Sequence, residues 1–129
     1  MKLKQLELKK AIFCEKNNDI VSVAKKLKKE KQRHIIVVDS KKPIGLISTT
    51  DINNRLVAEN KDPKKTKAID IMTSPILIKD IEDSVVETYT DLVKSNTYSC
   101  PVTEKGNLKG TIELRDIINH LAKIQLNKK

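Results

Sequence analysis

Two short strings of the chain place a glycine, a polar residue and an aspartate at the same spacing. Residues Gly45 to Asp51 have the sequence Gly-Leu-Ile-Ser-Thr-Thr-Asp, and residues Gly110 to Asp116 have the sequence Gly-Thr-Ile-Glu-Leu-Arg-Asp. A carboxylate can accept both hydrogens of a ribose diol, and the hydroxyls and free backbone N–H groups at a helix start can bind phosphate. Glycine lets the backbone approach another group closely. The strings therefore predict a place that holds a polyol beside an anion.

The same residue types also have an ordinary structural interpretation. Ser, Thr and Asp are common helix caps, and glycine at the end of a strand often marks a bulge. A cap can be any of several residues, whereas the aspartate recurs at one position in both strings. The duplication therefore favours the binding interpretation without removing the structural one.

Both strings belong to a longer duplication whose equivalent residues lie 65 positions apart, as Lys2 and Lys67 do. Lys2 to Leu56 aligns without a gap with Lys67 to Leu121, and most identical pairs are apolar. Two copies of about 60 residues are each marginal alone, which favours a pseudo-two-fold domain whose halves bury each other's apolar faces. The cleft of such a domain is where we expect the function.

Each copy is predicted to run strand, helix, strand, strand, helix. In the first copy, apolar runs at 11–14, 35–38 and 44–47 favour strands, and helical spacing begins at Ile20 after the cap residues 17–19. In the second copy the strands are expected at 76–78, 100–102 and 108–112. The predicted fold class is α/β, with two pseudo-symmetric β-α-β-β-α repeats packed as one domain. The repeats are 1–59 and 67–124, joined by a polar linker at 60–66 and followed by a tail at 125–129.

Composition limits the classes of function. The 129 residues carry a net charge of +9, with lysines scattered along the chain, and aromatics make up 2%. So few aromatics argue against a stacking platform for single-stranded nucleic acid. The charge is explained either by attraction to an anion or by soluble, lysine-rich helix faces, and composition does not choose between them. No stretch is apolar enough for a membrane span, and the charged amino terminus does not fit a signal peptide, so we expect a cytoplasmic protein.

Neither a metal site nor a catalytic site is predicted. Cys14 and Cys100 have no CxxC spacing and lie in apolar runs, which favours buried reduced thiols, and His34 and His120 have no metal-ligand spacing. The sequence also contains no Ser-His-Asp, paired-carboxylate or phosphate-loop pattern. We therefore expect a protein that is not an enzyme.

The order of elements, the segment Ile69–Thr73 (Ile-Asp-Ile-Met-Thr), the segment Tyr98–Val102 (Tyr-Ser-Cys-Pro-Val) and the duplicated Gly…Asp string resemble a tandem pair of CBS domains. This cystathionine-β-synthase domain pair is also called a Bateman module, and the resemblance covers residues 1 to about 124. It implies a regulatory module that binds AMP, ADP, ATP or S-adenosylmethionine in the cleft between the repeats. It also implies a homodimer that signals to an effector protein.

The resemblance assigns the ribose hydroxyls of one ligand to Asp51, with Ser48 and Thr50 beside it. The residues that would line the base of this ligand come from the second repeat and are Leu77, Ile78, Tyr98 and Pro101.

A second ligand would use Asp116 for its ribose, with residues of the first repeat around it, namely Ile12, Phe13, Arg33 and His34. Here the sequence departs from the family pattern, because Glu113 replaces the expected Ser or Thr and Ile36 stands where proline is common. A second carboxylate near a phosphate lowers affinity unless it is paired, and the candidates for pairing are Arg33, His34 and Arg115. We expect the Asp51 site to bind and the Asp116 site to be weak, altered or empty.

Two alternatives to a nucleotide sensor stay open. The charge of +9 suggests a basic nucleic-acid-binding protein, which a steep salt dependence would reveal, although no zinc finger, RRM or helix-turn-helix pattern supports it. A scaffold with inactive ligand sites is the other alternative. Substitution of Asp51 by Ala should abolish nucleotide binding in the sensor alone.

Overall fold

The computed structural model describes residues 1–127, which form two compact units. We name each unit by its candidate carboxylate. The Asp51 unit comprises residues Ala11–Ile76, and the Asp116 unit comprises Met1–Lys10 together with the chain from Leu77 onward.

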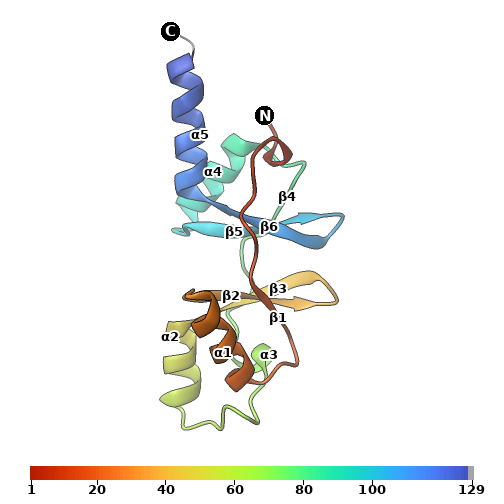
Figure 1. Ribbon diagram of the computed structural model, residues 1–129, viewed down its shortest axis with the longest axis vertical. Helices are drawn as coiled ribbons and strands as arrows, with labels where there is room; N and C mark the ends of the chain where they lie inside the picture. The colour runs from red at the N-terminus through yellow and green to blue at the C-terminus, as the bar shows by residue number, and fades with distance from the viewer. Residues whose placement is uncertain (128–129) are drawn as a thin grey trace. The chain divides into compact units, whose positions relative to one another are not determined.

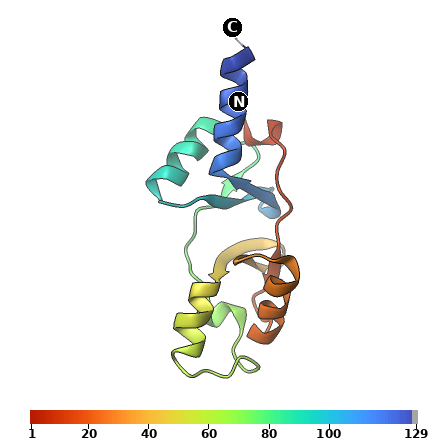
Figure 2. The same cartoon turned by 60° about the vertical axis from the view of Figure 1, so that its left-hand side comes forward.

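The Asp51 unit contains β1 (Phe13–Glu15), α1 (Ile20–Glu30), β2 (His34–Asp39), β3 (Lys42–Ser48), α2 (Thr49–Ile52), a π-helical turn η2 (Asn53–Val57) and α3 (Ala68–Ile71). Its sheet has the order β1-β2-β3, with β1 parallel and β3 antiparallel to β2. The helices α1 and α2 cover one face of this sheet (Figures 1 and 2).

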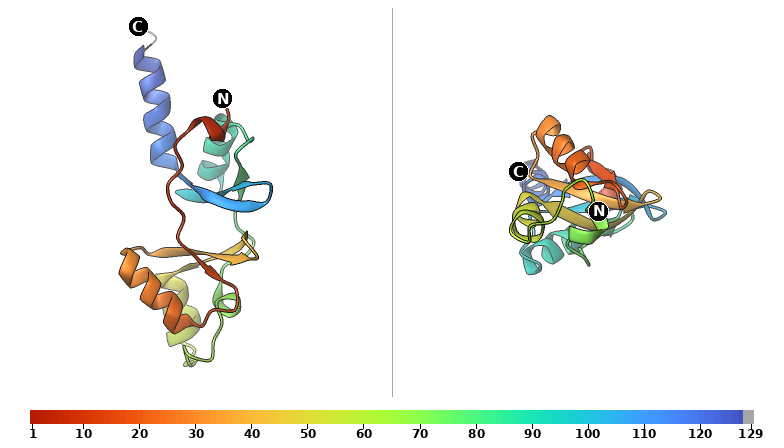
Figure 3. Two further views of the ribbon diagram at one scale, coloured as in Figure 1. Left: turned by 45° about the vertical axis from the view of Figure 1, so that its right-hand side comes forward. Right: turned by 90° about the horizontal axis from the view of Figure 1, so that it is seen from below.

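The Asp116 unit repeats the pattern. It contains a short 3-10 helix η1 (Leu3–Gln5), β4 (Lys79–Asp80), α4 (Val85–Lys94), β5 (Ser99–Glu104), β6 (Asn107–Glu113) and α5 (Leu114–Asn127). The sheet order is β4-β5-β6, again with one parallel and one antiparallel pair, and α4 and α5 cover one face of it (Figure 3). The predicted α/β class and the β-α-β-β-α order of each repeat are confirmed.

Local sequence explains the helices that flank the sheets. Asp19 caps α1 by accepting a hydrogen bond from the backbone N–H of Ser22 at 2.9 Å, and Ser84 caps α4 in the same way. Both helices turn an apolar stripe inward, which in α1 is Ile20, Val23 and Leu27. A capped helix with one apolar face then packs on its sheet without leaving buried polar groups unpaired.

Each unit takes its first segment from the other repeat. Leu3 is buried in the Asp116 unit, where its N–H donates to the carbonyl of Asp83 at 2.9 Å. At the equivalent position Ala68 is buried in the Asp51 unit, and its N–H donates to the carbonyl of Asn18 at 2.8 Å. The compact units therefore differ from the sequence repeats 1–59 and 67–124, because the apolar residues of each first segment are buried in the unit of the other repeat.

Three further segments differ from the sequence-based expectations. The strand expected at 76–78 lies at Lys79–Asp80, where Lys79 pairs with Val102. The expected linker 60–66 packs within the Asp51 unit, since the carbonyls of Pro63 and Thr66 both accept from the N–H of Ile20 at 3.0 Å. Of the expected tail, residues 125–127 continue α5, and 128–129 lie outside the described residues.

Candidate functional site

Gly45 is required because the chain's own backbone crosses strand β3 at this point. Leu46 and Thr73 exchange two backbone hydrogen bonds of 3.0 and 2.7 Å. A Cβ atom on Gly45 would lie 2.5 Å from Sδ of Met72 and 2.9 Å from the carbonyl oxygen of Thr73. The close approach predicted at this glycine is therefore present within the Asp51 unit, and the group that approaches is a segment of the protein itself.

Asp51 is held in one orientation by a reciprocal cap at the start of α2. The N–H of Ser48 donates to Oδ2 of Asp51 at 2.9 Å, and the N–H of Asp51 donates to Oγ of Ser48 at 3.0 Å. The hydroxyl of Thr73 lies 3.2 Å from each carboxylate oxygen, and Nε of Arg55 lies 3.8 Å from Oδ1. The side chain keeps 13% of its surface exposed. Asp51 therefore does serve as a capping residue of α2, as the structural interpretation of the string predicts.

The cap still leaves Asp51 able to accept further hydrogen bonds. A carboxylate has about four acceptor positions, and Ser48 and Thr73 together occupy about two of them. Thr50 is exposed in the first turn of α2. A fixed carboxylate with unfilled acceptor positions can receive both hydroxyls of a diol without rearranging the helix.

The sequence-based assignment did not include Thr73 and Arg55. Arg55 lies four residues after Asp51, a spacing that places two side chains on one helix face, and it also donates to the carbonyl of Met72 at 2.8 Å. Helical spacing alone could have identified it. Thr73 comes from a segment 22 residues away, as the numbering shows, and no local pattern links it to Asp51.

The other residues predicted for the Asp116 ligand lie at one end of the β1-β2-β3 sheet. Ile12 accepts a hydrogen bond from the N–H of Ile36, and Phe13 is partly exposed with the ammonium of Lys26 4.7 Å from its ring centroid. The carbonyl of Arg33 accepts from the N–H of Thr49 at 3.0 Å, and His34 opens β2 with an exposed side chain.

The residues predicted to line the base of the Asp51 ligand belong to the Asp116 unit. Leu77 packs against the core of that unit, Ile78 is exposed, and Pro101 is buried in β5. Tyr98 is 80% exposed, and its carbonyl accepts from the N–H of Leu114 at 2.7 Å. For both predicted sites, the carboxylate and the base-lining residues come from different units, and their joint role stays a prediction.

In the Asp116 unit the two carboxylates are bridged by a lysine. Nζ of Lys9 lies 3.0 Å from Oε1 of Glu113 and 3.5 Å from Oδ2 of Asp116, and Arg115 lies 3.7 Å from the other oxygen of Glu113. The hydrogen bond with Glu113 raises the pKa of Lys9 above its usual value. Arg115 is thus one of the expected partners of Glu113, whereas Lys9 is a partner that the sequence did not indicate.

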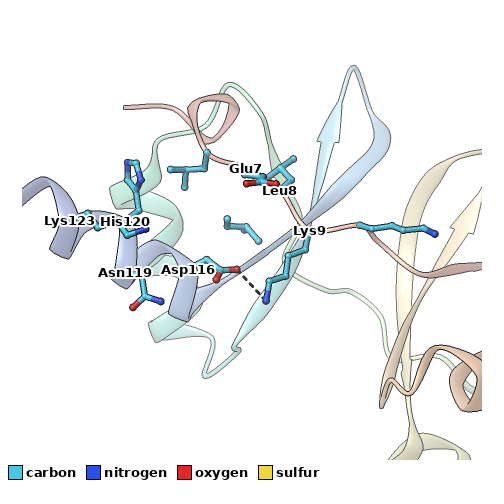
Figure 4. Close-up of a pocket in the computed structure, with 10 residues that line it drawn as sticks. Glu7, Leu8, Lys9, Asp116, Asn119, His120 and Lys123 are labelled. Atoms are coloured by element: carbon cyan, nitrogen blue, oxygen red, sulfur yellow. Dashed lines mark ion pairs between the residues drawn. The ribbon is translucent and has the colours of Figure 1, made fainter.

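An open hollow of about 610 Å³ adjoins Asp116 (Figure 4). Its size falls within the usual range of small-molecule sites. The hollow lies between the first segment and α5, and its lining is mixed in charge: Leu6, Glu7, Leu8, Lys9, Lys10, Ile112, Asp116, Asn119, His120 and Lys123. The Asp116 unit therefore offers a cavity next to its carboxylate, with an ammonium already against that carboxylate.

Both cysteines are buried and unpaired with each other. Burial raises the pKa of the Cys14 thiol to about 11 and that of Cys100 to about 12. Thiols in this state are inert at neutral pH. Within residues 1–127 there is no group of three or more His, Cys, Asp or Glu side chains that could hold a metal ion, and no helix long and apolar enough to cross a membrane.

The family is settled by the match of the CBS domain model to two segments, residues 3–58 and 68–123. The chain belongs to the CBS domain family. It is a CBS-domain pair, a type of module that is typically regulatory and binds ligands, and the resemblance seen in the sequence is confirmed.

Solved structures of other proteins share the fold. The CBS domain pair/ACT domain protein of Thermotoga maritima is 17% identical, with 96% of this chain and 98% of that chain covered at a TM-score of 0.77. OpuCA of Staphylococcus aureus is 19% identical, with 91% and 97% covered at a TM-score of 0.75. An uncharacterised protein of Methanopyrus kandleri is 27% identical over 100 residues, and the match spans 76% of this chain and about half, 51%, of that protein.

Proposed function

We propose that this CBS-domain pair is a non-catalytic regulatory module that binds an adenosine ligand, with Asp51 accepting the ribose hydroxyls. The ligand class comprises AMP, ADP, ATP and S-adenosylmethionine. The observation that supports the proposal most directly is the fixed, partly exposed carboxylate of Asp51 at the start of α2. A cytoplasmic location fits such a role.

The difference between the two carboxylates supports the choice of Asp51. The partners of Asp51 leave acceptor positions open, and Ser48 supplies the hydroxyl of the family pattern. At Asp116, the ammonium of Lys9 already lies within 3.5 Å, and Glu113 adds a negative charge. A ribose at Asp116 would have to displace Lys9, and a phosphate there would meet Glu113. We therefore propose that the Asp51 carboxylate binds more tightly than Asp116.

A sensor needs an element whose equilibrium the ligand changes. We propose that the chain forms a homodimer, and that this dimer transmits its ligand-bound or ligand-free state to an effector protein. Exposed apolar side chains on α4 support a contact between copies, since Val86 is 61% and Val93 is 52% exposed, with Tyr89 on the same helix and Ile118 on α5. Exposed apolar groups that gather on adjacent helices are typical of a contact surface.

Calorimetric titration with AMP, ADP, ATP and S-adenosylmethionine tests the proposal. One ligand should bind the native chain, and Asp51→Asn should weaken it by about tenfold to a hundredfold, because two charge-assisted hydrogen bonds become neutral ones. Asp70→Asn is the matched control, since Asp70 caps α3 through the same bond, at 2.9 Å from the N–H of Lys67. This control should leave the affinity unchanged.

Asp116→Asn completes the series. If Asp116→Asn lowers the affinity for the ligand and Asp51→Asn does not, the assignment of the ribose to Asp51 is wrong. If none of the four ligands binds the native chain, the sensor itself is refuted and a scaffold with inactive ligand sites takes its place.

A further inference from the structure

The outer side of α1 and the turn after it carry a group of exposed basic residues. We call this group the α1 basic face, and its members are Lys25, Lys28, Lys29, Lys31 and Arg33. Among the salt bridges of residues 1–127, none involves a member of this face. By contrast, Lys26 on the same helix donates to the carbonyl of Phe13 and lies over its ring. The α1 basic face is therefore a set of charges without internal partners.

Folding does not explain these charges, because the equivalent helix in the other repeat folds without them. The positions 65 residues further on are Thr90, Val93, Lys94, Asn96 and Tyr98. Both α1 and α4 bury three inward residues and both are capped at their amino ends. Lysines near a helix carboxyl end do stabilise its dipole, yet α4 has only Lys94 in its last turn. The positions of the α1 basic face therefore carry five cations where the equivalent positions of the other repeat carry one. This is more positive charge than stabilisation of the helix dipole requires.

The spacing of the charges suits a regular row of anions. Lys25, Lys28 and Lys29 are three and four residues apart, which places them on one face of the helix. Four residues of helix rise by about 6 Å, and one strand of duplex DNA presents a phosphate about every 3.4 Å along its axis. A short length of backbone can thus contact several of these lysines together.

The remaining surface of α1 distinguishes between classes of partner. Its other exposed side chains are small, Ser22 and Ala24, so the face offers no large apolar anchor. A protein interface normally has an apolar core, and a membrane-surface helix inserts apolar side chains. No member of the α1 basic face is aromatic, and the nearby ring of Phe13 is covered by the ammonium of Lys26, so the face offers no stacking platform for single-stranded bases either. We propose that the α1 basic face binds the phosphate backbone of duplex nucleic acid, without reading its sequence.

The test uses fluorescence anisotropy of a labelled DNA duplex and a labelled RNA duplex with the full chain, from about 50 to 200 mM salt. The variant Lys25→Gln, Lys28→Gln, Lys29→Gln should bind at least about tenfold more weakly. Its slope of log K against log salt should be shallower by about 2.7, which is three contacts at about 0.9 each. The control variant Lys41→Gln, Lys94→Gln, Lys105→Gln removes the same charge from exposed lysines elsewhere and should behave as the native chain.

Three results would overturn the proposal. They are an absence of duplex binding by the native chain, an equal loss in both variants, and full competition by polyglutamate or phosphatidylserine vesicles. The last result would assign the face to an acidic protein or to a lipid surface. The two duplexes show which backbone is preferred, and an unchanged thermal transition of both variants shows that folding is intact. The proposal is independent of adenosine binding, which both variants should retain.

Discussion

Replacement of Gly45 by alanine should destabilise the Asp51 unit and disturb its carboxylate together. The new Cβ would lie 2.5 Å from Sδ of Met72, which can move, and 2.9 Å from the carbonyl oxygen of Thr73. The backbone of Thr73 is held in place, because its carbonyl accepts from the N–H of Leu46 and its N–H donates to the carbonyl of Leu46. Loss of those bonds costs about 1 kcal/mol each, and overpacking adds about 1–3 kcal/mol. We expect the free energy of unfolding to fall by about 3–5 kcal/mol.

Urea denaturation followed by circular dichroism measures this change, with Gly106→Ala as the control. Gly106 has a φ of 84°, so alanine there meets only the left-handed backbone cost, about 1–2 kcal/mol. A cost for Gly45→Ala no larger than that of the control would refute the steric explanation of this glycine. Because the displaced segment also carries Thr73, which donates to Asp51, the variant should bind the adenosine ligand more weakly at temperatures where it remains folded.

Further predictions concern the thiols, a helix cap and the dimer. Cys14 and Cys100 should resist maleimide until urea is added, and stability should fall as the pH rises from about 9 through about 11 and 12, because only the unfolded chain ionises its thiols near 9. A Cys100→Ala variant should lose less stability over that range than the native chain, and an equal loss would contradict the argument from burial. Ser84→Ala should lower the free energy of unfolding by about 1 kcal/mol through the lost cap of α4, and an unchanged urea midpoint would show that the cap contributes nothing. Val86→Lys with Val93→Lys should convert a dimer into a monomer in analytical ultracentrifugation at an unchanged melting temperature, and a persistent dimer would place the contact elsewhere.

The sequence by itself determined the features that depend on the spacing of residues a few positions apart. The duplication, the α/β order of each repeat, the cap of α1, and the position of Asp51 at a helix start all follow from residue types and short-range periodicity. The family followed as well, because its motifs are ordered along the chain. These features depend on residues a few positions apart, and they can be inferred without knowing what packs against them.

Only the tertiary structure decided which segments meet the carboxylates. The first segment of each repeat packs in the unit of the other repeat, which brings Thr73 to Asp51 and Lys9 to Glu113 and Asp116. The same glycine that suggested a ligand's approach is crossed by the chain itself. Burial of apolar side chains such as Leu3 and Ala68 stabilises this exchange of first segments between the units. That burial depends on the shape of a core whose residues lie far apart in the sequence, so local patterns do not reveal it.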